Sequence, residues 1–126
     1  MKVKVGVVGA TGYTGEEIVR SLARHEGVKM TSLTAIIDKP MAFSDLFPTH
    51  KGTVDIVCKE LDLDEVISSV DLVFLALPHT VSMKYVPKFL AAGKKVIDLS
   101  ADYRLTADVF KEWYKAKHTD SANLNK

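Results

Sequence analysis

Three glycines separate a short apolar run from a helical pattern near the start of the chain, in the segment Gly9-Ala10-Thr11-Gly12-Tyr13-Thr14-Gly15. The preceding run, residues 3–8, is rich in valine, too short for a helix and closed by glycine, so it predicts a buried β-strand. After the glycines, apolar residues recur on one helical face before a stop at Gly27: Ile18, Val19, Leu22 and Ala23. A strand, a tight turn and an amphipathic helix in this order point to an α/β fold.

Strand patterns continue to alternate with helical ones along the chain. Further strands are expected at residues 28–37, 53–58, 71–77 and 95–99. The alternation predicts a doubly wound, Rossmann-like α/β fold with a mainly parallel sheet and helices on both faces. We expect this dinucleotide-binding domain to span residues 1–117 and the polar residues 118–126, which lack periodicity, to form a loose tail.

The helical segments carry their own boundary signals. Acids from Asp62 onward suit the start of a helix, and the pattern that begins at Val81 is interrupted by Pro87 and ended by Gly93. Residues 38–51 indicate a loop with at most one short helical turn near 42–46. A last helix is expected after a cap at Thr106, with three aromatic side chains on one side: Phe110, Trp113 and Tyr114.

Composition excludes several classes of protein. The 126 residues, 47% hydrophobic and 26% charged, suffice for one globular domain with a buried core. Seventeen basic and sixteen acidic residues are spread along the chain, so we expect neither a nucleic-acid partner nor a membrane surface. We find no signal peptide and no apolar stretch of roughly 20 residues. The single cysteine, Cys58, excludes an internal disulfide, and a reducing cytoplasm is the default location.

The glycine segment also carries the first functional hypothesis. A tight turn between a strand and a helix brings backbone N–H groups and a helix N-terminus against a pyrophosphate, which favours dinucleotide binding. In that interpretation Gly9 permits the turn, Gly12 lets phosphate approach the backbone, and Gly15 lets the helix pack closely on the strand. The alternative is a plain glycine-rich turn. Glu16 and Glu17 argue mildly against phosphate packing unless they point to solvent.

Other candidates follow the strands at the edge where open α/β sheets bind ligands. Asp38 lies near the position of the acid that holds the cofactor ribose, although Asp38-Lys39-Pro40 is also an ordinary turn. The segment Leu77-Pro78-His79 follows the central strand and should border the nicotinamide. We interpret His79 as loop scaffolding rather than a catalytic base.

Arg104 and Cys58 are the candidates for substrate binding and for nucleophilic attack. Arg104 follows Ser100-Ala101-Asp102-Tyr103, where it could hold a phosphate or carboxylate bidentately or form an ion pair with Asp102. Cys58 would serve as an acyl-transfer nucleophile only if it were activated. It ends a strand-like run with no glycine elbow, helix N-terminus or paired histidine beside it, so we interpret it as a buried structural thiol.

Four motifs, spread over nearly the whole chain, resemble those of the N-acetyl-gamma-glutamyl-phosphate reductase family and stand in the same order. They are the glycine segment, Ala76-Leu77-Pro78-His79, Val96-Ile97-Asp98-Leu99-Ser100-Ala101-Asp102-Tyr103-Arg104, and Trp113-Tyr114. The resemblance implies reduction of N-acetylglutamyl phosphate to N-acetylglutamate semialdehyde and phosphate with NADPH, in arginine biosynthesis. Lysine-pathway paralogues and aspartate-semialdehyde dehydrogenase share parts of the pattern and are the alternatives.

The resemblance assigns roles to residues of this chain. Cofactor contacts are implied for the glycine segment, the end of the second strand and the nicotinamide-side loop: Gly9, Thr11, Gly12, Tyr13, Thr14, Gly15, Thr34, Lys39, Ala76, Leu77 and Pro78. Substrate contacts are implied for Ser100 and Arg104, and no metal site is expected. The expected cofactor is NADP, with NAD as the alternative. The expected partner is a small acyl phosphate, and the family enzyme is expected to be a homo-oligomer.

Three features depart from the family pattern. Where the family places a serine and an arginine to hold the 2′-phosphate, this chain has Thr34-Ala35-Ile36-Ile37-Asp38-Lys39, and Lys39 is the nearby cation. The family commonly has a glycine after the Pro-His pair, where this chain has Thr80. The family's nucleophilic cysteine and assisting histidine lie in a second, catalytic and dimerisation domain, so we expect no catalytic residue here. A free-standing module that senses nucleotide or regulates a partner is the alternative to a reductase fragment.

Overall fold

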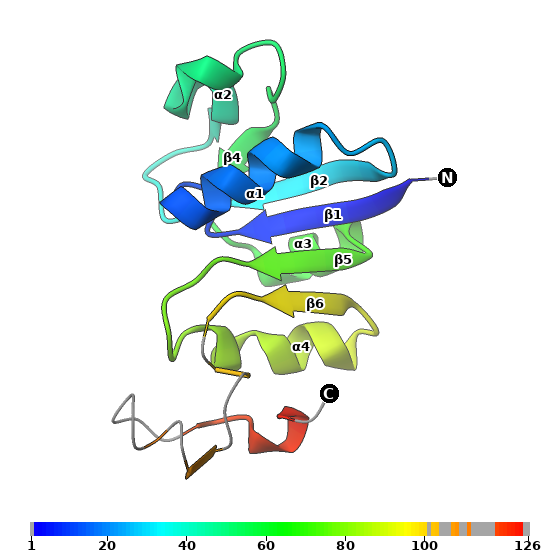
Figure 1. Cartoon of the computed structure of the whole chain (residues 1–126), viewed down its shortest axis with the longest axis vertical. Coiled ribbons are helices and arrows are strands. Elements are labelled where there is room, and N and C mark those ends of the chain that lie inside the picture. Colours follow the sequence, from blue (N-terminus) through cyan, green and yellow to red (C-terminus); the bar gives the residue numbers. More distant parts are fainter. Residues whose placement is uncertain (1, 101, 104–106, 109–110, 112–117, 125–126) are drawn as a thin grey trace.

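The computed structural model describes residues 2–100, 102–103, 107–108, 111 and 118–124 (Figure 1). The strands in this described part are β1 (Val3–Val8), β2 (Val28–Thr34), β3 (Met41–Ala42), β4 (Val57–Lys59), β5 (Leu72–Leu75) and β6 (Lys95–Asp98). They form one sheet in the order β3-β4-β2-β1-β5-β6. Neighbouring strands run parallel except β3, which pairs antiparallel with β4.

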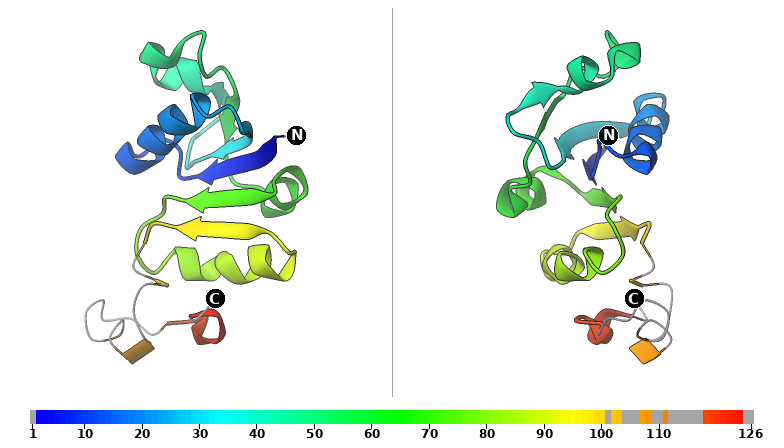
Figure 2. Two further views of the ribbon diagram at one scale, coloured as in Figure 1. Left: turned by 45° about the vertical axis from the view of Figure 1, so that its right-hand side comes forward. Right: turned by 90° about the vertical axis from the view of Figure 1, so that its left-hand side faces the viewer.

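Helices cover both faces of this sheet. As the edge-on view in Figure 2 shows, α1 (Tyr13–Ala23) lies on one face, while α3 (Leu63–Ser69) and α4 (Val86–Ala91) lie on the other. Shorter turns are α2 (Phe43–Leu46), η1 (Pro48–His50), η2 (Ser82–Lys84) and η3 (Ser121–Asn123). Parallel strands with helices on both faces are the doubly wound arrangement that the sequence predicts, so the fold class is confirmed. Within the described residues, no helix is both long and apolar enough to cross a membrane.

Strand β1 contributes to two separate hydrophobic cores. Val7 is buried with Val19 of α1 and Leu33 of β2 under the first face. The next residue, Val8, is buried with Phe89 of α4 under the second face. Because successive side chains of a strand point to opposite faces, a strand covered on both sides needs an unbroken apolar run. Residues 5–8 of β1, which are all buried and contain no charged side chain, meet this requirement.

Several strands have different bounds from those that their apolar sequence suggests. β2 stops at Thr34 rather than at residue 37, and β5 stops at Leu75 rather than at residue 77. β4 covers Val57–Lys59 instead of residues 53–58. The ladder hydrogen bonds stop where the chain turns across the edge of the sheet, while apolar residues continue beyond that point. Hydrophobicity alone therefore does not locate the end of a strand.

Expected interruptions of the pattern are found. The loop 38–51 contains the expected helical turn as α2, together with the short strand β3 and η1. Pro87 lies in the first turn of α4, after the separate turn η2, which confirms that the proline restarts this helix. The helix expected after Thr106, with Phe110, Trp113 and Tyr114, falls on residues outside the described part of the chain.

The segment 118–124 is not the loose tail that its polar sequence suggests. His118 and Asp120 are buried, and Tyr103 donates a hydrogen bond to Asp120 Oδ2 at 2.6 Å. The His118 ring contacts the backbone oxygen of Asp102 and packs edge-on against Tyr103. The prediction of a frayed end is wrong for these residues, because burial through hydrogen bonds leaves no hydrophobic periodicity in a sequence.

Candidate functional site

A cleft of about 680 Å³ lies at the carboxyl ends of the parallel strands. In Figure 1 the arrowheads of these strands point to one edge of the sheet, which is the edge where open α/β sheets bind ligands. Several predicted cofactor residues line this cleft: Gly9, Thr11, Gly12, Thr34, Ala76, Leu77 and Pro78. The structure therefore brings together three segments that are far apart in the sequence.

Gly9 and Gly15 are required by the packing of the protein itself. Gly9 has φ +87°, and a β-carbon there would lie 2.3 Å from the carbonyl oxygen of Ala76. A β-carbon at Gly15 would lie 2.0 Å from the carbonyl oxygen of Gly9. The turn is also fixed to β2, since the N–H groups of Gly9 and Ala10 donate to Thr34 O at 2.9 and 3.0 Å. Both glycines therefore hold α1 close to the ends of β1 and β2.

Gly12 has a different reason to be glycine. Its φ of −76° suits any residue, and a β-carbon there would come no closer to the protein than 3.9 Å, at Gly9 O. Gly12 lines the cleft and is the residue from which the eleven-residue helix α1 starts, without a side-chain cap. The free space at Gly12 therefore faces the positive end of a helix, where an anion binds favourably.

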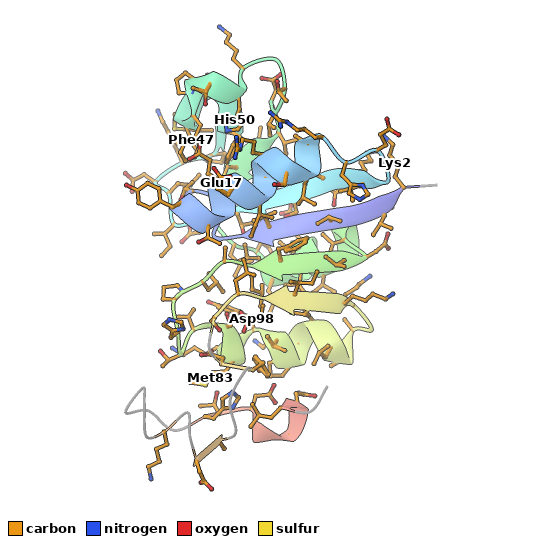
Figure 3. All side chains as sticks on the ribbon, viewed as in Figure 1. Lys2, Glu17, Phe47, His50, Met83 and Asp98 are labelled. Atoms are coloured by element: carbon orange, nitrogen blue, oxygen red, sulfur yellow. The ribbon has the colours of Figure 1, made fainter. Side chains whose placement is uncertain are left out.

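The two acids that follow the glycine segment are engaged away from it. Glu17 pairs with Arg20 of the same helix at 2.5 Å. Glu16 Oε1 lies 3.3 Å from Nε2 of His50, which is buried on η1 and packs against the Phe47 ring. Figure 3 shows Glu17, Phe47 and His50 gathered beside α1. These contacts remove the main sequence-based objection to phosphate at this turn.

The end of β2 forms a second wall of the cleft. Thr34 is buried, and its Oγ1 has no hydrogen-bond partner among the described residues. Ala35 N donates to Lys59 O at 3.0 Å, which holds this end of β2 beside β4. Ile36 follows, fully exposed and lining the cleft. The predicted ribose and phosphate ligands Asp38 and Lys39 are exposed in the turn beyond, outside the residues that line the cleft.

A buried carboxylate fixes the loop around Pro78, which the sequence predicts to border the nicotinamide. Asp102 is fully buried and accepts hydrogen bonds from Thr80 N at 2.7 Å and Met83 N at 2.8 Å. Thr80 has φ +74°, a left-handed conformation that a β-branched residue adopts at a cost. His79 is exposed in the same turn. Asp102 therefore fixes the loop that follows Pro78.

The predicted substrate residues are placed unequally. Ser100 is buried, and its Oγ donates to Asp98 Oδ2 at 2.7 Å and accepts from Asp102 N at 3.1 Å. These contacts form a tight turn after β6, so the described hydrogen bonds of Ser100 are structural. Arg104 lies outside the described residues. A substrate contact at either residue stays a prediction.

Cys58 is a core residue, as the sequence suggests. It is fully buried on β4, in the core under α1. Burial raises the pKa of its thiol to about 11, because the thiolate would lose its hydration. At neutral pH the thiol is therefore protonated and is not activated for nucleophilic attack.

Some predicted site residues lie beside the cleft, and others were missed. Tyr13 and Thr14 are exposed on the first turn of α1, and Gly15 is buried beneath it. Sequence reasoning missed several cleft residues that follow β2 and β4, lie on α3 or lie at the start of α4: Ile36, Glu60, Leu61, Leu63, Tyr85 and Lys88. The strand expected at residues 53–58 ends two residues before Glu60, so the sequence does not single out Glu60 as the residue that directly follows β4.

A family description, semialdehyde dehydrogenase NAD binding domain, matches residues 4–119. The chain belongs to this family. The N-acetyl-gamma-glutamyl-phosphate reductase of Desulfotalea psychrophila is 45% identical over 114 residues, which are 90% of this chain and 33% of that protein. The reductase of Heliobacterium modesticaldum is 43% identical over 117 residues, 92% of this chain and 33% of that protein. The chain spans about a third of the length of these relatives.

Solved structures share the fold of this semialdehyde dehydrogenase domain. Aspartate semialdehyde dehydrogenase from Candida albicans, solved with NADP, has a TM-score of 0.71 at 26% identity, over 86% of this chain and 32% of that one. Scyllo-inositol dehydrogenase from Lactobacillus casei has a TM-score of 0.61 at 21% identity, over 78% of this chain and 28% of that one. The second likeness bears on the fold alone. The expected family and the NAD(P)-binding Rossmann-like fold are confirmed.

Proposed function

We propose that this domain is the nucleotide-binding part of an N-acetyl-gamma-glutamyl-phosphate reductase, which reduces N-acetylglutamyl phosphate to N-acetylglutamate semialdehyde and phosphate. The observation that carries the proposal is Gly12, whose missing side chain leaves open space at the N-terminus of α1, in contrast to Gly15. The identity of 45% to a reductase of that name supports the choice of substrate. The proposal places the protein in arginine biosynthesis.

The residues of the cleft suit a dinucleotide. The first backbone N–H groups of α1, at the glycine turn, would hold the pyrophosphate. Thr34, whose buried hydroxyl has no partner among the described residues, would face the adenosine half of the cofactor. Ala76, Leu77 and Pro78 would border the nicotinamide and exclude water from one side of it. The bound nicotinamide supplies the hydride for reduction of the acyl carbon.

The nucleophile of the reaction is proposed to come from outside this segment. Hydride reduction in this chemistry first needs a thioester, and a thioester needs an activated thiolate. Cys58 is buried in the core under α1, with a pKa of about 11, and is absent from the residues that line the cleft. We therefore expect the 126-residue chain to bind nucleotide without reducing an acyl phosphate. Ser100 and Arg104 remain proposed contacts of the substrate.

Calorimetric titration with NADP and with NAD tests the binding half of the proposal. We expect Gly12→Asp to abolish binding, because its carboxylate would occupy the position of the pyrophosphate and repel it. Thr49→Asp is a matched control, since it adds the same charge at an exposed position on η1 and should leave the affinity unchanged. Unchanged affinity in Gly12→Asp would show that the glycine turn is not the site.

A coupled assay tests the catalytic half. The reverse reaction, phosphate-dependent oxidation of N-acetylglutamate semialdehyde, is followed by the absorbance of the reduced cofactor. We expect no activity from the chain alone, and activity once the C-terminal two thirds of a reductase relative are fused to it. Activity of the chain alone that disappears in Cys58→Ser would contradict both the proposed location of the nucleophile and the structural role of Cys58.

A further inference from the structure

We propose that Glu60 is the carboxylate that faces the adenosine ribose and that this cleft consequently favours NAD(H) over NADP(H). This inference rests on the proposed function, because it assumes that the cleft binds a dinucleotide. In Rossmann-type domains an acid at the end of the second strand holds the ribose hydroxyls, whereas a nearby arginine accommodates the 2′-phosphate of NADP. In this chain the acid comes from the neighbouring strand.

The register of the sheet places Glu60 level with the end of β2. Thr34, the last residue of β2, pairs with Lys59, the last residue of β4. Ala35 N donates to Lys59 O at 3.0 Å, so these two residues lie side by side. Ile36 follows Ala35 and Glu60 follows Lys59, so both leave the sheet from neighbouring positions. Glu60 lines the cleft together with Ala35 and Ile36. Its carboxylate is thus carried to the place where the ribose of a bound cofactor would lie.

Two further observations mark this end of the cleft as a site for a neutral diol. Glu60 is exposed, and neither an ion pair nor a hydrogen bond engages its carboxylate among the described residues. Thr34 is only 1% exposed, and its Oγ1 also has no hydrogen-bond partner among the described residues. A carboxylate and a hydroxyl together can accept and donate the hydrogen bonds that two ribose hydroxyls need.

Among the described residues, few positive charges at this end of the cleft could hold a 2′-phosphate. The sequence has no arginine between Arg24 and Arg104. Lys59 Nζ is already paired with Glu65 Oε1. The two residues that directly follow Thr34 are Ala35, which carries a methyl group, and Ile36, which carries an exposed apolar side chain. Neither side chain can hydrogen-bond a phosphate.

Two further lysines of the described residues have to be considered, Lys39 in the turn after β2 and Lys88 in the cleft. Lys39 is exposed in the turn after β2, next to the exposed Asp38. Lys88 lines the cleft from α4, which lies beside β6 at the opposite side of the sheet from β4 (Figure 1). A 2′-phosphate next to Glu60 would therefore meet a like charge, whereas the free 2′-hydroxyl of NAD would donate to it.

Binding titrations with NADH and with NADPH, followed by the fluorescence of the reduced nicotinamide, test this inference without measuring catalysis. For the unmodified chain we expect the dissociation constant of NADH to be roughly tenfold lower than that of NADPH. Glu60→Gln should weaken the binding of NADH and strengthen the binding of NADPH, so that the two dissociation constants come within about twofold of each other. Ile36→Arg should lower the dissociation constant of NADPH by at least about tenfold, because the arginine can make a bidentate contact with the 2′-phosphate.

Control measurements separate the possible failures. Glu26→Gln removes an exposed carboxylate from the turn before β2 and should leave both constants unchanged. Thermal unfolding of each variant verifies that the fold is retained, as expected for exposed positions. Tighter binding of NADPH than of NADH by the unmodified chain, or an unchanged ratio in Glu60→Gln, would overturn the inference and leave the proposed function standing. Failure of both nucleotides to bind would overturn the proposed function and the inference with it.

Discussion

Alanine at Gly15 should lower the stability of the fold, whereas alanine at Gly12 should lower the affinity for nucleotide, because the two glycines serve different purposes. At Gly15 the new β-carbon would lie 2.0 Å from Gly9 O and 2.8 Å from the α-carbon of Ala10. Favourable carbon contacts need about 3.5 Å, so α1 would have to move away from β1 by more than about 1 Å. That movement loosens the contacts of the fully buried Val19.

The cost of this overpacking is about 3 kcal/mol, which lowers the midpoint of thermal unfolding by on the order of 10 °C. Gly12→Ala should change the free energy of unfolding by less than about 0.5 kcal/mol, because its β-carbon has 3.9 Å of clearance and its φ is ordinary. The same variant should bind NADP and NAD at least about tenfold more weakly, because the methyl group occupies the approach of the phosphate.

Differential scanning calorimetry and nucleotide titration on the same samples provide both measurements. Equal loss of stability in the two variants would refute the distinction between a packing glycine and a ligand glycine. Full nucleotide affinity in Gly12→Ala would refute the claim that the space at Gly12 is reserved for the cofactor.

Three further changes test other parts of the structure. Thr80→Gly should raise the free energy of unfolding in urea by about 0.5–1 kcal/mol, because relief of the left-handed strain at φ +74° outweighs the added freedom of the unfolded chain; a loss of stability would contradict the strain. Asp102→Ala should lower it by about 3 kcal/mol, since Thr80 N and Met83 N both lose a charged acceptor, and a change below about 1 kcal/mol would contradict that role. Burial raises the pKa of Cys58 from 9.0 to about 11, so unfolding releases a proton in that interval. Stability should therefore fall as pH rises from about 9 to 11, and this fall should be smaller by about 2–3 kcal/mol in Cys58→Ala; identical pH profiles of the two proteins would refute the shift.

The first strand, glycine turn and helix were predictable because their causes are local. The short valine-rich run closed by Gly9 predicts β1, the glycine spacing predicts the turn, and the apolar face around Val19 predicts α1. The interruption at Pro87 is equally local, because the missing N–H of proline acts within one helical turn. For such features the sequence and the structure agree on the order and type of the elements, although α1 ends at Ala23, before the expected stop at Gly27.

The cleft residues missed by sequence analysis depend on which strands become neighbours. Glu60 gains its place only because β4 pairs with β2, and no local pattern states that pairing. The apolar residues Ile36 and Leu77 look like continuations of strands, although the ladders have already ended and both residues line the cleft. In the sequence, an apolar residue inside a strand therefore cannot be distinguished from one that follows the strand and lines the cleft.

Long-range hydrogen bonds explain the misjudged C-terminal segment. His118 and Asp120 are polar and unpatterned, yet both are buried against Asp102 and Tyr103. Their partners are 16 and 17 residues away in sequence, so only the folded chain brings the groups together. Burial of this kind leaves no periodic signal.

The central claim is that a dinucleotide lies along the cleft with its pyrophosphate at the glycine turn. Amide chemical shifts of the ¹⁵N-labelled chain, followed by NMR during titration with NADPH and NADH, test this claim at each residue. We predict saturable shifts at Gly12 and Tyr13, at Ala35 and at Leu77, with little change at Gly93 on the far edge of the sheet. Saturable shifts confined to residues outside the cleft, or none with either nucleotide, would contradict the account.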